Sequence, residues 1–330
     1  MTARAGTLSV ATIVLATLVS LACSKGDDAL ISKSRRVFGT LAESASAPAD
    51  APELIRLGRA LYFSPALSLN RTQSCNTCHP VDDGRPGADS LPTSPGALNA
   101  EGRRNTPTVL NADLHIAQFW DGRSKTLEEQ AAGPILNPVE MAMPDAASVE
   151  ARARGGELAE RTLFSAAFPG ETDPYTLTHV ARALAAFERT LRTRDRFDDF
   201  IEGDTGALTA KEKEGLALFF DTGCASCHGG PLLGGDKFQK LGIIHRYPNE
   251  SDRGRFEVTS DEIDEFVFKV PALRNVALTS PYFHDGAVET LDDAVDRMAW
   301  LQLGKKLTPA EREAIVAFLG SLSDQERRPH

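Results

Sequence analysis

Two five-residue stretches, CNTCH at residues 75–79 and CASCH at residues 224–228, decide the architecture of this chain. In each stretch, two cysteines three positions apart are followed directly by a histidine. Two thiols one helical turn apart can both bond to the vinyl groups of one porphyrin, and the next imidazole then lies where it can bind the iron. The pattern therefore predicts two covalently attached haem c groups. The predicted attachment residues and proximal ligands are Cys75, Cys78, His79, Cys224, Cys227 and His228.

Other uses of paired cysteines explain these stretches less well. Two CxxC pairs are also typical of a structural zinc site, but zinc would leave the histidine after each pair unexplained. A thioredoxin-like redox pair needs a βαβ pattern, which surrounds neither stretch. An exported chain could instead oxidise its thiols to disulfides. However, four of the five cysteines belong to the two motifs, so we assign these four to thioether bonds.

Helical periodicity dominates the sequence around both motifs. Apolar residues at helical spacing predict a helix over 51–63, before the first motif, and another over 208–220, before the second. Further helices are expected over 176–193 and 308–322, and residues 265–270 are the only strand candidate. The sequence therefore indicates a mainly α fold. We expect two tandem class-I cytochrome c-like helical domains, each with one covalently bound haem, long loops and little β structure.

Two of these helices begin with a capping-box pattern. Thr209 and Glu212 form the first pattern. Thr308 and Glu311 form the second, with Pro309 at the first helical position. Both patterns predict a sharply defined helix start in the second half of the chain.

The two halves of the chain also repeat each other after their motifs. The block FWDGRSKTLEEQ at 119–130 and the block FHDGAVETLDDA at 283–294 share Phe, Asp, Gly, Thr, Leu and an acidic residue at the same spacing. RRNTPTVL and LRNVAL precede them. Such self-similarity is typical of a duplicated module, with one haem in each copy.

The N-terminal segment has the pattern of an export signal. Arg4 precedes an apolar run over 8–22, which is short for a membrane span of roughly 20 apolar residues. A membrane anchor is the alternative. The segment also resembles a bacterial lipoprotein signal in which Cys23 would be lipidated, although Ser20 stands where that pattern prefers Leu. We therefore expect a periplasmic protein that meets the membrane only through a lipid anchor at Cys23, if at all.

Composition changes divide the rest of the chain. Two glycines and two acidic residues interrupt the pattern at 201–207 and mark the best boundary. The predicted organisation is a signal peptide over 1–23, a flexible tether over 24–50, an N-terminal cytochrome c domain with one haem over 51–203, a C-terminal cytochrome c domain with the other haem over 204–323 and a tail over 324–330.

The charge of the chain restricts its partners. Its 330 residues have a formal net charge of −10, which argues against binding to nucleic acid and suits a positively charged small partner or docking protein.

The sixth ligand of the second haem has one attractive candidate, Met298. A thioether opposite histidine raises the reduction potential and closes the iron to small ligands. Met298 could equally be a core residue on the apolar helix face that contains Leu291, Val295 and Leu301. Spacing alone leaves both interpretations open.

From about Leu54 to Leu319 the chain resembles the bacterial di-haem cytochrome c peroxidase family, which also contains the enzymes that mature tryptophylquinone cofactors in methylamine dehydrogenase. The motifs that carry the resemblance are LGRALYFSPALSLNRTQSCNTCH, RRNTPTVLNA, QFWDGR, GPILNPVEMAMP, GLALFFDTGCASCH, LRNVALTSPYFHDG and MAWLQLG. The resemblance implies a peroxidatic N-terminal haem, an electron-transfer C-terminal haem and a small cytochrome c or cupredoxin as electron donor. We also consider a homodimer.

The resemblance assigns roles to further residues. Met298 matches the methionine ligand of the peroxidases, where the quinone-forming branch has a tyrosine, and Trp120 matches the tryptophan between the haems. The family's hydrogen peroxide pocket corresponds to Gln130, Pro134 and Glu140. The family's inter-domain Ca²⁺ site corresponds to Asn105 and the backbone carbonyls of Thr279 and Pro281. By composition alone, Trp120 would be a buried aromatic, Glu140 a surface acid and Asn105 a turn residue.

The chain departs from the family pattern in one place. Many members carry a histidine that caps the peroxidatic iron in the resting enzyme, within a segment like SPGH, whereas this chain reads SPGALN with Ala97 at that position. His115 is the nearest spare histidine, but the family supplies no ligand there. We therefore expect an open iron and a peroxidase that needs no reductive activation. The alternatives are a peroxide-dependent protein-oxidising enzyme, which the missing histidine also fits, and a plain di-haem electron carrier.

Overall fold

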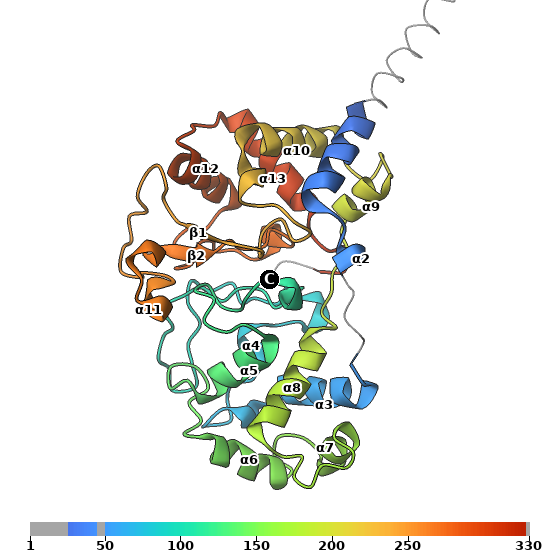
Figure 1. Cartoon of the computed structure of the whole chain (residues 1–330), viewed down its shortest axis with the longest axis vertical. Coiled ribbons are helices and arrows are strands. Elements are labelled where there is room, and N and C mark those ends of the chain that lie inside the picture. Colours follow the sequence, from blue (N-terminus) through green and yellow to red (C-terminus); the bar gives the residue numbers. More distant parts are fainter. Residues whose placement is uncertain (1–25, 45–49, 328–330) are drawn as a thin grey trace, which may run out of the picture.

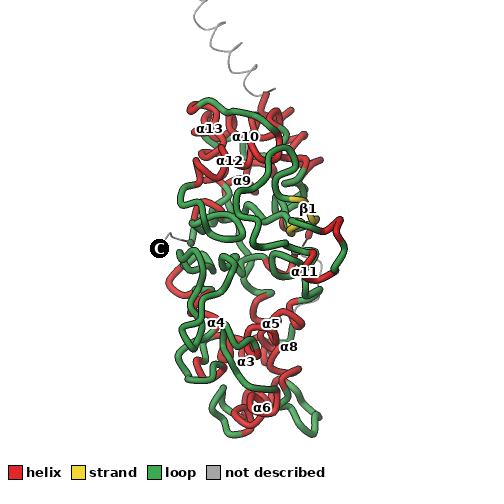
Figure 2. Tube along the Cα trace, turned by 90° about the vertical axis from the view of Figure 1, so that its left-hand side faces the viewer, coloured by secondary structure: helices red, strands yellow, loops and turns green. Residues whose placement is uncertain are grey.

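The computed structural model describes residues 26–44 and 50–327, which form two helical lobes stacked along the long axis of the molecule (Figure 1). Helices lie at the two ends, and loops fill most of the middle, where the lobes meet (Figure 2). The N-terminal lobe contains α3 (Pro52–Tyr62), η1 (Pro65–Leu67), α4 (Cys75–Cys78), η2 (Asp82–Gly84), η3 (Ala112–Leu114), α5 (Leu127–Leu136), α6 (Ala146–Arg154), α7 (Arg161–Ala167) and α8 (Leu177–Glu188). The C-terminal lobe contains α9 (Arg196–Glu202), α10 (Ala210–Thr222), η4 (Cys224–Ser226), β1 (Phe238–Lys240), α11 (Phe256–Thr259), η5 (Glu262–Asp264), β2 (Val267–Lys269), η6 (Val276–Leu278), α12 (Leu291–Leu303) and α13 (Pro309–Ser321). The short helix α2 (Leu41–Ser44) lies between the lobes (Figure 1).

Each lobe is built around one close helix crossing. In the N-terminal lobe α3 crosses α8 at Gly58, where an added Cβ would lie 1.8 Å from the Ala183 carbonyl oxygen. In the C-terminal lobe α10 crosses α13 at Gly215, where an added Cβ would lie 1.8 Å from the Ala314 carbonyl oxygen. Only glycine permits backbones to approach so closely. The predicted mainly helical pair of cytochrome c-like domains is confirmed.

The predicted duplication is confirmed at the level of backbone dihedrals. Asn111 and Asn275, which are equivalent in the repeat, both adopt left-handed conformations and precede the 3₁₀ helices η3 and η6. Phe119 and Phe283 are also equivalent and have φ values of 65° and 68°. Positive φ is uncommon for non-glycine residues, so its recurrence at matched positions is strong evidence for one module used twice.

The expected helices and the expected strand all occur. Capping boxes begin α10 at Thr209 and α13 at Thr308, with the paired glutamates that the sequence indicated. The strand candidate forms β2, which pairs antiparallel with β1. Strand β1 was not predicted, because a three-residue strand is too short to show a period of two.

The predicted flexible tether over 24–50 is wrong for residues 26–38, which are helical. Ile31 and Phe38 are 8% and 1% exposed and belong to the core of the C-terminal lobe. Phe38 packs edge-on against Phe197, with 5.6 Å between ring centroids. The apolar side of this helix is buried against α9 and α10, so the segment is part of the folded structure.

The core of the C-terminal lobe also crosses the predicted boundary at residue 203. Phe197, Phe200 and Ile201 of α9 pack in the same core as α10 and α13. Arg274, which is 1% exposed, pairs with two aspartates at the start of α9, Asp195 and Asp198. The chain therefore enters the C-terminal lobe before the Gly-rich interruption that suggested the boundary.

The described part of the predicted tail, 324–327, contacts the N-terminal lobe. The Arg327 guanidinium donates hydrogen bonds to the carbonyls of Val81 and Arg85, at 3.0 and 3.1 Å. The predicted signal peptide and Cys23 lie outside the described residues. Within 26–44 and 50–327, no helix has the length and apolar character needed to cross a membrane.

Candidate functional site

The first CxxCH motif opens onto a cavity of about 530 Å³ in the N-terminal lobe. Residues 75–78 form the single turn α4, and the His79 N–H closes that turn on the Cys75 carbonyl at 2.9 Å. The His79 Nδ1 lies 3.3 Å from the Gly87 carbonyl, which leaves Nε2 for the iron. Burial lowers the pKa of His79, which favours the neutral imidazole that binds metals. The loop over 80–107 thus supplies a backbone acceptor that orients the ligand.

The three residues assigned to the peroxide pocket meet in the wall of this cavity. Gln130 and Pro134 project from α5, and Glu140 lies in the turn after it. The amide of Asn137 donates to the Glu140 carboxyl at 2.7 Å. Burial raises the pKa of Glu140, while the Asn137 hydrogen bond and the charge of Arg123 oppose that rise. A buried carboxyl beside the proximal histidine's cavity can act as a general acid–base group.

Ala97 is fixed beside this group. Its backbone N–H donates to the Glu140 carbonyl at 2.6 Å, and its side chain is 4% exposed. His115 and Met141 also line the cavity. However, the His115 Nδ1 lies 2.9 Å from the Lys269 ammonium, and the Nε2 edge of its ring packs against Gly235 of the C-terminal lobe. Within the described residues this Nε2 has no hydrogen-bond partner, and Met141 packs in the core of the N-terminal lobe. The open iron stays a prediction.

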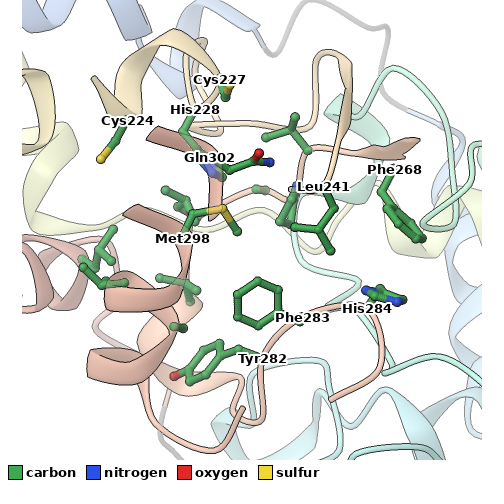
Figure 3. A pocket seen from close by; sticks show the side chains of 18 of the residues that line it. Cys224, Cys227, His228, Leu241, Phe268, Tyr282, Phe283, His284, Met298 and Gln302 are labelled. Atoms are coloured by element: carbon green, nitrogen blue, oxygen red, sulfur yellow. The ribbon is translucent and has the colours of Figure 1, made fainter. Parts of the chain in front are cut away.

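The second CxxCH motif opens onto a cavity of about 240 Å³ in the C-terminal lobe. His228 enters it after η4 and Met298 enters it from α12 (Figure 3). The His228 Nδ1 lies 3.1 Å from the Leu233 carbonyl, so its Nε2 is also the nitrogen left for iron. Leu291 and Val295 line the same cavity as Met298, so that apolar face of α12 faces the cavity as well.

The cysteine chemistry of both cavities fits haem c. The four motif cysteines form no disulfide, and within residues 26–44 and 50–327 no cluster of three or more His, Cys, Asp or Glu side chains could hold a metal ion. Each motif instead places two thiols and one oriented imidazole at the mouth of a largely apolar cavity. This donor set is the one that thioether attachment and axial ligation of iron require.

Trp120 lies in the wall common to both cavities. Its indole N–H donates to the Asn105 carbonyl at 2.9 Å. Its own carbonyl accepts from the Lys269 N–H at 2.7 Å, and the Asn105 N–H donates to the His284 carbonyl at 2.7 Å. These bonds fix an aromatic ring between the two haem sites, at the contact of the two lobes.

The three residues assigned to calcium share the wall of the C-terminal cavity. These residues are Asn105, Thr279 and Pro281. The Asn105 amide NH₂ donates to the carbonyls of Leu91 and Pro92, at 2.9 and 3.3 Å, which fixes the amide and leaves its oxygen for another partner. Neutral oxygen ligands of this kind suit Ca²⁺.

Sequence reasoning missed three buried polar residues that line the two cavities. Lys269, the last residue of β2, lines both cavities. The His284 ring is 2% exposed, and neither ring nitrogen has a hydrogen-bond partner. Glu188, at the end of α8, is 6% exposed and lines the N-terminal cavity. For Lys269 and His284 the position in the repeat was the available signal, whereas Glu188 looks like an ordinary polar residue in its local sequence and has no counterpart in that register.

Comparison with known proteins agrees with this arrangement. The family model for di-haem cytochrome c peroxidase matches residues 52–206, and the model for cytochrome c matches residues 212–323. The cytochrome c551 peroxidase of Pseudomonas aeruginosa is 46% identical over 287 residues, covering 82% of this chain and 79% of the relative. The cytochrome c551 peroxidase of Nitrosomonas europaea is 44% identical over 276 residues, covering 83% of this chain and 81% of the relative. A crystal structure of a MauG-like protein associated with microbial copper homeostasis has a TM-score of 0.74 and 30% identity, covering 84% of this chain and 91% of that one. The chain belongs to the di-haem cytochrome c peroxidase family.

Proposed function

We propose that this protein reduces hydrogen peroxide to water with electrons from a small cytochrome c or cupredoxin. The observation that carries the proposal is the pairing of two unequal haem sites across Trp120. One site has a buried carboxyl and a glutamine beside a proximal histidine, and the other has a histidine and a methionine in one cavity. When bound, the haems supply an iron that accepts peroxide at the first site and a one-electron carrier at the second.

At the first site, the Glu140 carboxyl moves the proton. It takes a proton from the bound peroxide and returns it to the departing oxygen, so that water leaves. Such general acid–base help contributes roughly 10²–10⁴ in rate. Asn137 holds the carboxyl in place, and the Gln130 amide orients the substrate. Pro134 lacks an N–H, so it leaves the carbonyl of Gln130, four residues earlier in α5, without its helical partner.

At the second site, His228 and Met298 would hold the haem iron together, and iron held by both would be closed to peroxide. A thioether ligand raises the reduction potential, which suits a site that accepts electrons from an outside donor. Trp120 then provides the aromatic ring through which electrons pass to the first site, one at a time. A calcium ion held by Asn105 and the two backbone carbonyls would fix the lobes around this path.

The assay that tests the proposal measures peroxide-dependent oxidation of a reduced small cytochrome c by the haem-loaded protein. We expect turnover without a reductive pretreatment, because Ala97 offers no ligand that must move. The resting ferric protein should show one five-coordinate high-spin haem and one six-coordinate low-spin haem. Ala97→His should convert the first to a six-coordinate low-spin form that turns over only after reduction. Two low-spin haems in the unaltered resting protein would contradict this account.

A second function is favoured by one observation, the alanine at position 97. A protein-oxidising enzyme that modifies Trp or Tyr side chains of a partner would also keep its iron open. Met298 opposes this alternative, since the quinone-forming branch has a tyrosine there. Mass spectrometry of candidate partner proteins after peroxide treatment separates the two functions. A plain electron carrier would exchange electrons without consuming peroxide.

The expected location is the periplasm, because covalent haem attachment takes place after export. Lipidation of Cys23 and a homodimer also belong to the proposal. Mass spectrometry of the exported protein and its molar mass in solution test them directly.

A further inference from the structure

The duplicated module places unlike residues at equivalent positions of the lobe contact. The register that pairs Phe119 with Phe283 also pairs Asn105 with Lys269. The backbones of these two residues play the same part. The Asn105 N–H donates to the His284 carbonyl and the Lys269 N–H donates to the Trp120 carbonyl, both at 2.7 Å. The contact of the two lobes therefore has an approximate two-fold symmetry, with Asn105 on one side and Lys269 on the other.

The same register extends to the whole candidate calcium site. The counterparts of Thr279 and Pro281 are His115 and Ala117. The Lys269 ammonium donates to the Ala117 carbonyl at 2.9 Å and lies 2.9 Å from the His115 Nδ1. The Lys269 Nζ therefore contacts His115 and Ala117. These two residues correspond in the repeat to Thr279 and Pro281, the proposed backbone ligands of calcium.

This ammonium has no anionic partner in the protein. Lys269 is 6% exposed, and within residues 26–44 and 50–327 it forms no ion pair. Asp121, the acidic residue whose charge reaches it, is bonded to Arg104 and Arg123. Burial lowers the pKa of Lys269 to about 7 and the charge of Asp121 opposes this. A buried cation is costly unless an anion faces it.

Lys269 lines both haem cavities. Each haem brings two propionate carboxylates. We propose that the Lys269 ammonium occupies, in the second copy of the module, the position that corresponds to the calcium ion of the first copy. There it binds a haem propionate at the common wall of the two cavities. The inference rests on the proposed function in two respects: both haems must be attached, and calcium must bind at Asn105, Thr279 and Pro281.

The experiment measures the midpoint potentials of both haems in calcium-saturated, haem-loaded protein, with no peroxide present. A nearby positive charge favours the reduced haem, which has one positive charge less. We expect Lys269→Met to shift the reduction equilibrium of one haem at least tenfold toward the oxidised form, about 59 mV for one electron. The haem that responds is the one whose propionate Lys269 binds. Absence of peroxide turnover in the unaltered haem-loaded protein, with the shifted potential still present in Lys269→Met, would instead count against the proposed function alone.

Two further variants serve as controls. Lys240→Met removes the same charge from an exposed position on β1, the strand paired with β2, and should leave both potentials unchanged. Lys269→Arg keeps the charge and should keep the potentials. Unchanged potentials in haem-loaded Lys269→Met would overturn the inference. If that variant fails to load haem, an experimental structure of the unaltered haem-loaded protein decides: the Lys269 Nζ must lie within hydrogen-bond distance of a propionate oxygen, and a longer separation overturns the inference.

Discussion

In the proposed function, the proton chemistry depends on Glu140. Glu140→Gln keeps the size of the side chain and its contact with Asn137, but it removes the group that exchanges a proton. We expect peroxide turnover to fall at least tenfold, with both haems retained. Steady-state kinetics and the haem absorption spectrum measure the two quantities. Glu129→Gln, at an exposed position of α5, is the matched control and should turn over like the unaltered protein. Full activity of Glu140→Gln would remove this carboxyl from the mechanism.

Glu188 should make stability depend on pH. Burial raises its pKa to about 8, helped by the charges of Glu128 and Asp113 and opposed by Arg189. Because the folded pKa lies above the unfolded value, the protonated carboxyl stabilises the fold at pH 4.5 and below, and this stability is lost as the pH rises toward 8. Glu188→Gln should abolish this pH-dependent loss of unfolding free energy, which is on the order of 3 kcal/mol. The Tm of the variant should therefore depend less on pH.

The control for this prediction is Glu313→Gln on the exposed face of α13, where the side chain is 75% exposed. That variant should keep the pH dependence of the unaltered protein. If Glu188→Gln also keeps it, the Glu188 carboxyl is not the group that titrates.

For individual residues, the sequence predicted the haem-binding cysteines and histidines but not the buried polar groups around the haem cavities. Cys75 and His79 could be identified because their spacing is dictated by the porphyrin itself. Glu188 and Lys269 could not, because their chemistry comes from burial and from neighbours in distant parts of the chain. The roles of Glu140 and Gln130 depended on the family resemblance, since a glutamate in a turn has no distinctive local pattern.

The helix crossings are the elements most sensitive to a single methyl group. Gly215→Ala would drive a Cβ into the backbone of α13 at Ala314, so the two helices must separate. Overpacking of this kind costs about 1–3 kcal/mol, and more where backbone is the obstacle. Gly320→Ala in α13 meets nothing within 4 Å and should stabilise the helix by about 0.5–1 kcal/mol. Denaturant unfolding of the two variants should therefore shift in opposite directions, and a neutral Gly215→Ala would show that the crossing is adaptable.

Elements were predictable where a local pattern specified them. Capping boxes and apolar stripes located α3, α10 and α13, whereas β1 depends on its partner strand. The helix over 26–38 was missed because its polar composition suggested a tether, although Ile31 and Phe38 lie on one buried side. Its stability comes from packing against α9 and α10, which no local pattern reveals.

The whole molecule can be understood as one module used twice and then made unequal. Both copies keep the left-handed turn at Asn111 and Asn275 and the same backbone exchange across the lobe contact. They differ where chemistry is assigned: Trp120 in one copy corresponds to His284 in the other, and Asn105 corresponds to Lys269. Duplication therefore supplies the common backbone arrangement, and substitutions at matched positions distinguish the site proposed to bind peroxide from the site proposed to carry electrons.

Calcium stoichiometry tests this view of the molecule. The haem-loaded, calcium-free protein should bind one Ca²⁺ per chain, because the matching position in the second copy already contains the Lys269 ammonium. Asn105→Leu should weaken calcium binding at least tenfold, since it removes the side-chain ligand, whereas Asn249→Leu at an exposed loop position should not. Isothermal titration calorimetry gives the stoichiometry and affinity. Calcium at 100 times its Kd should stabilise the protein by about 2.7 kcal/mol. Two calcium ions per chain would contradict the role given to Lys269, and none would remove the calcium site.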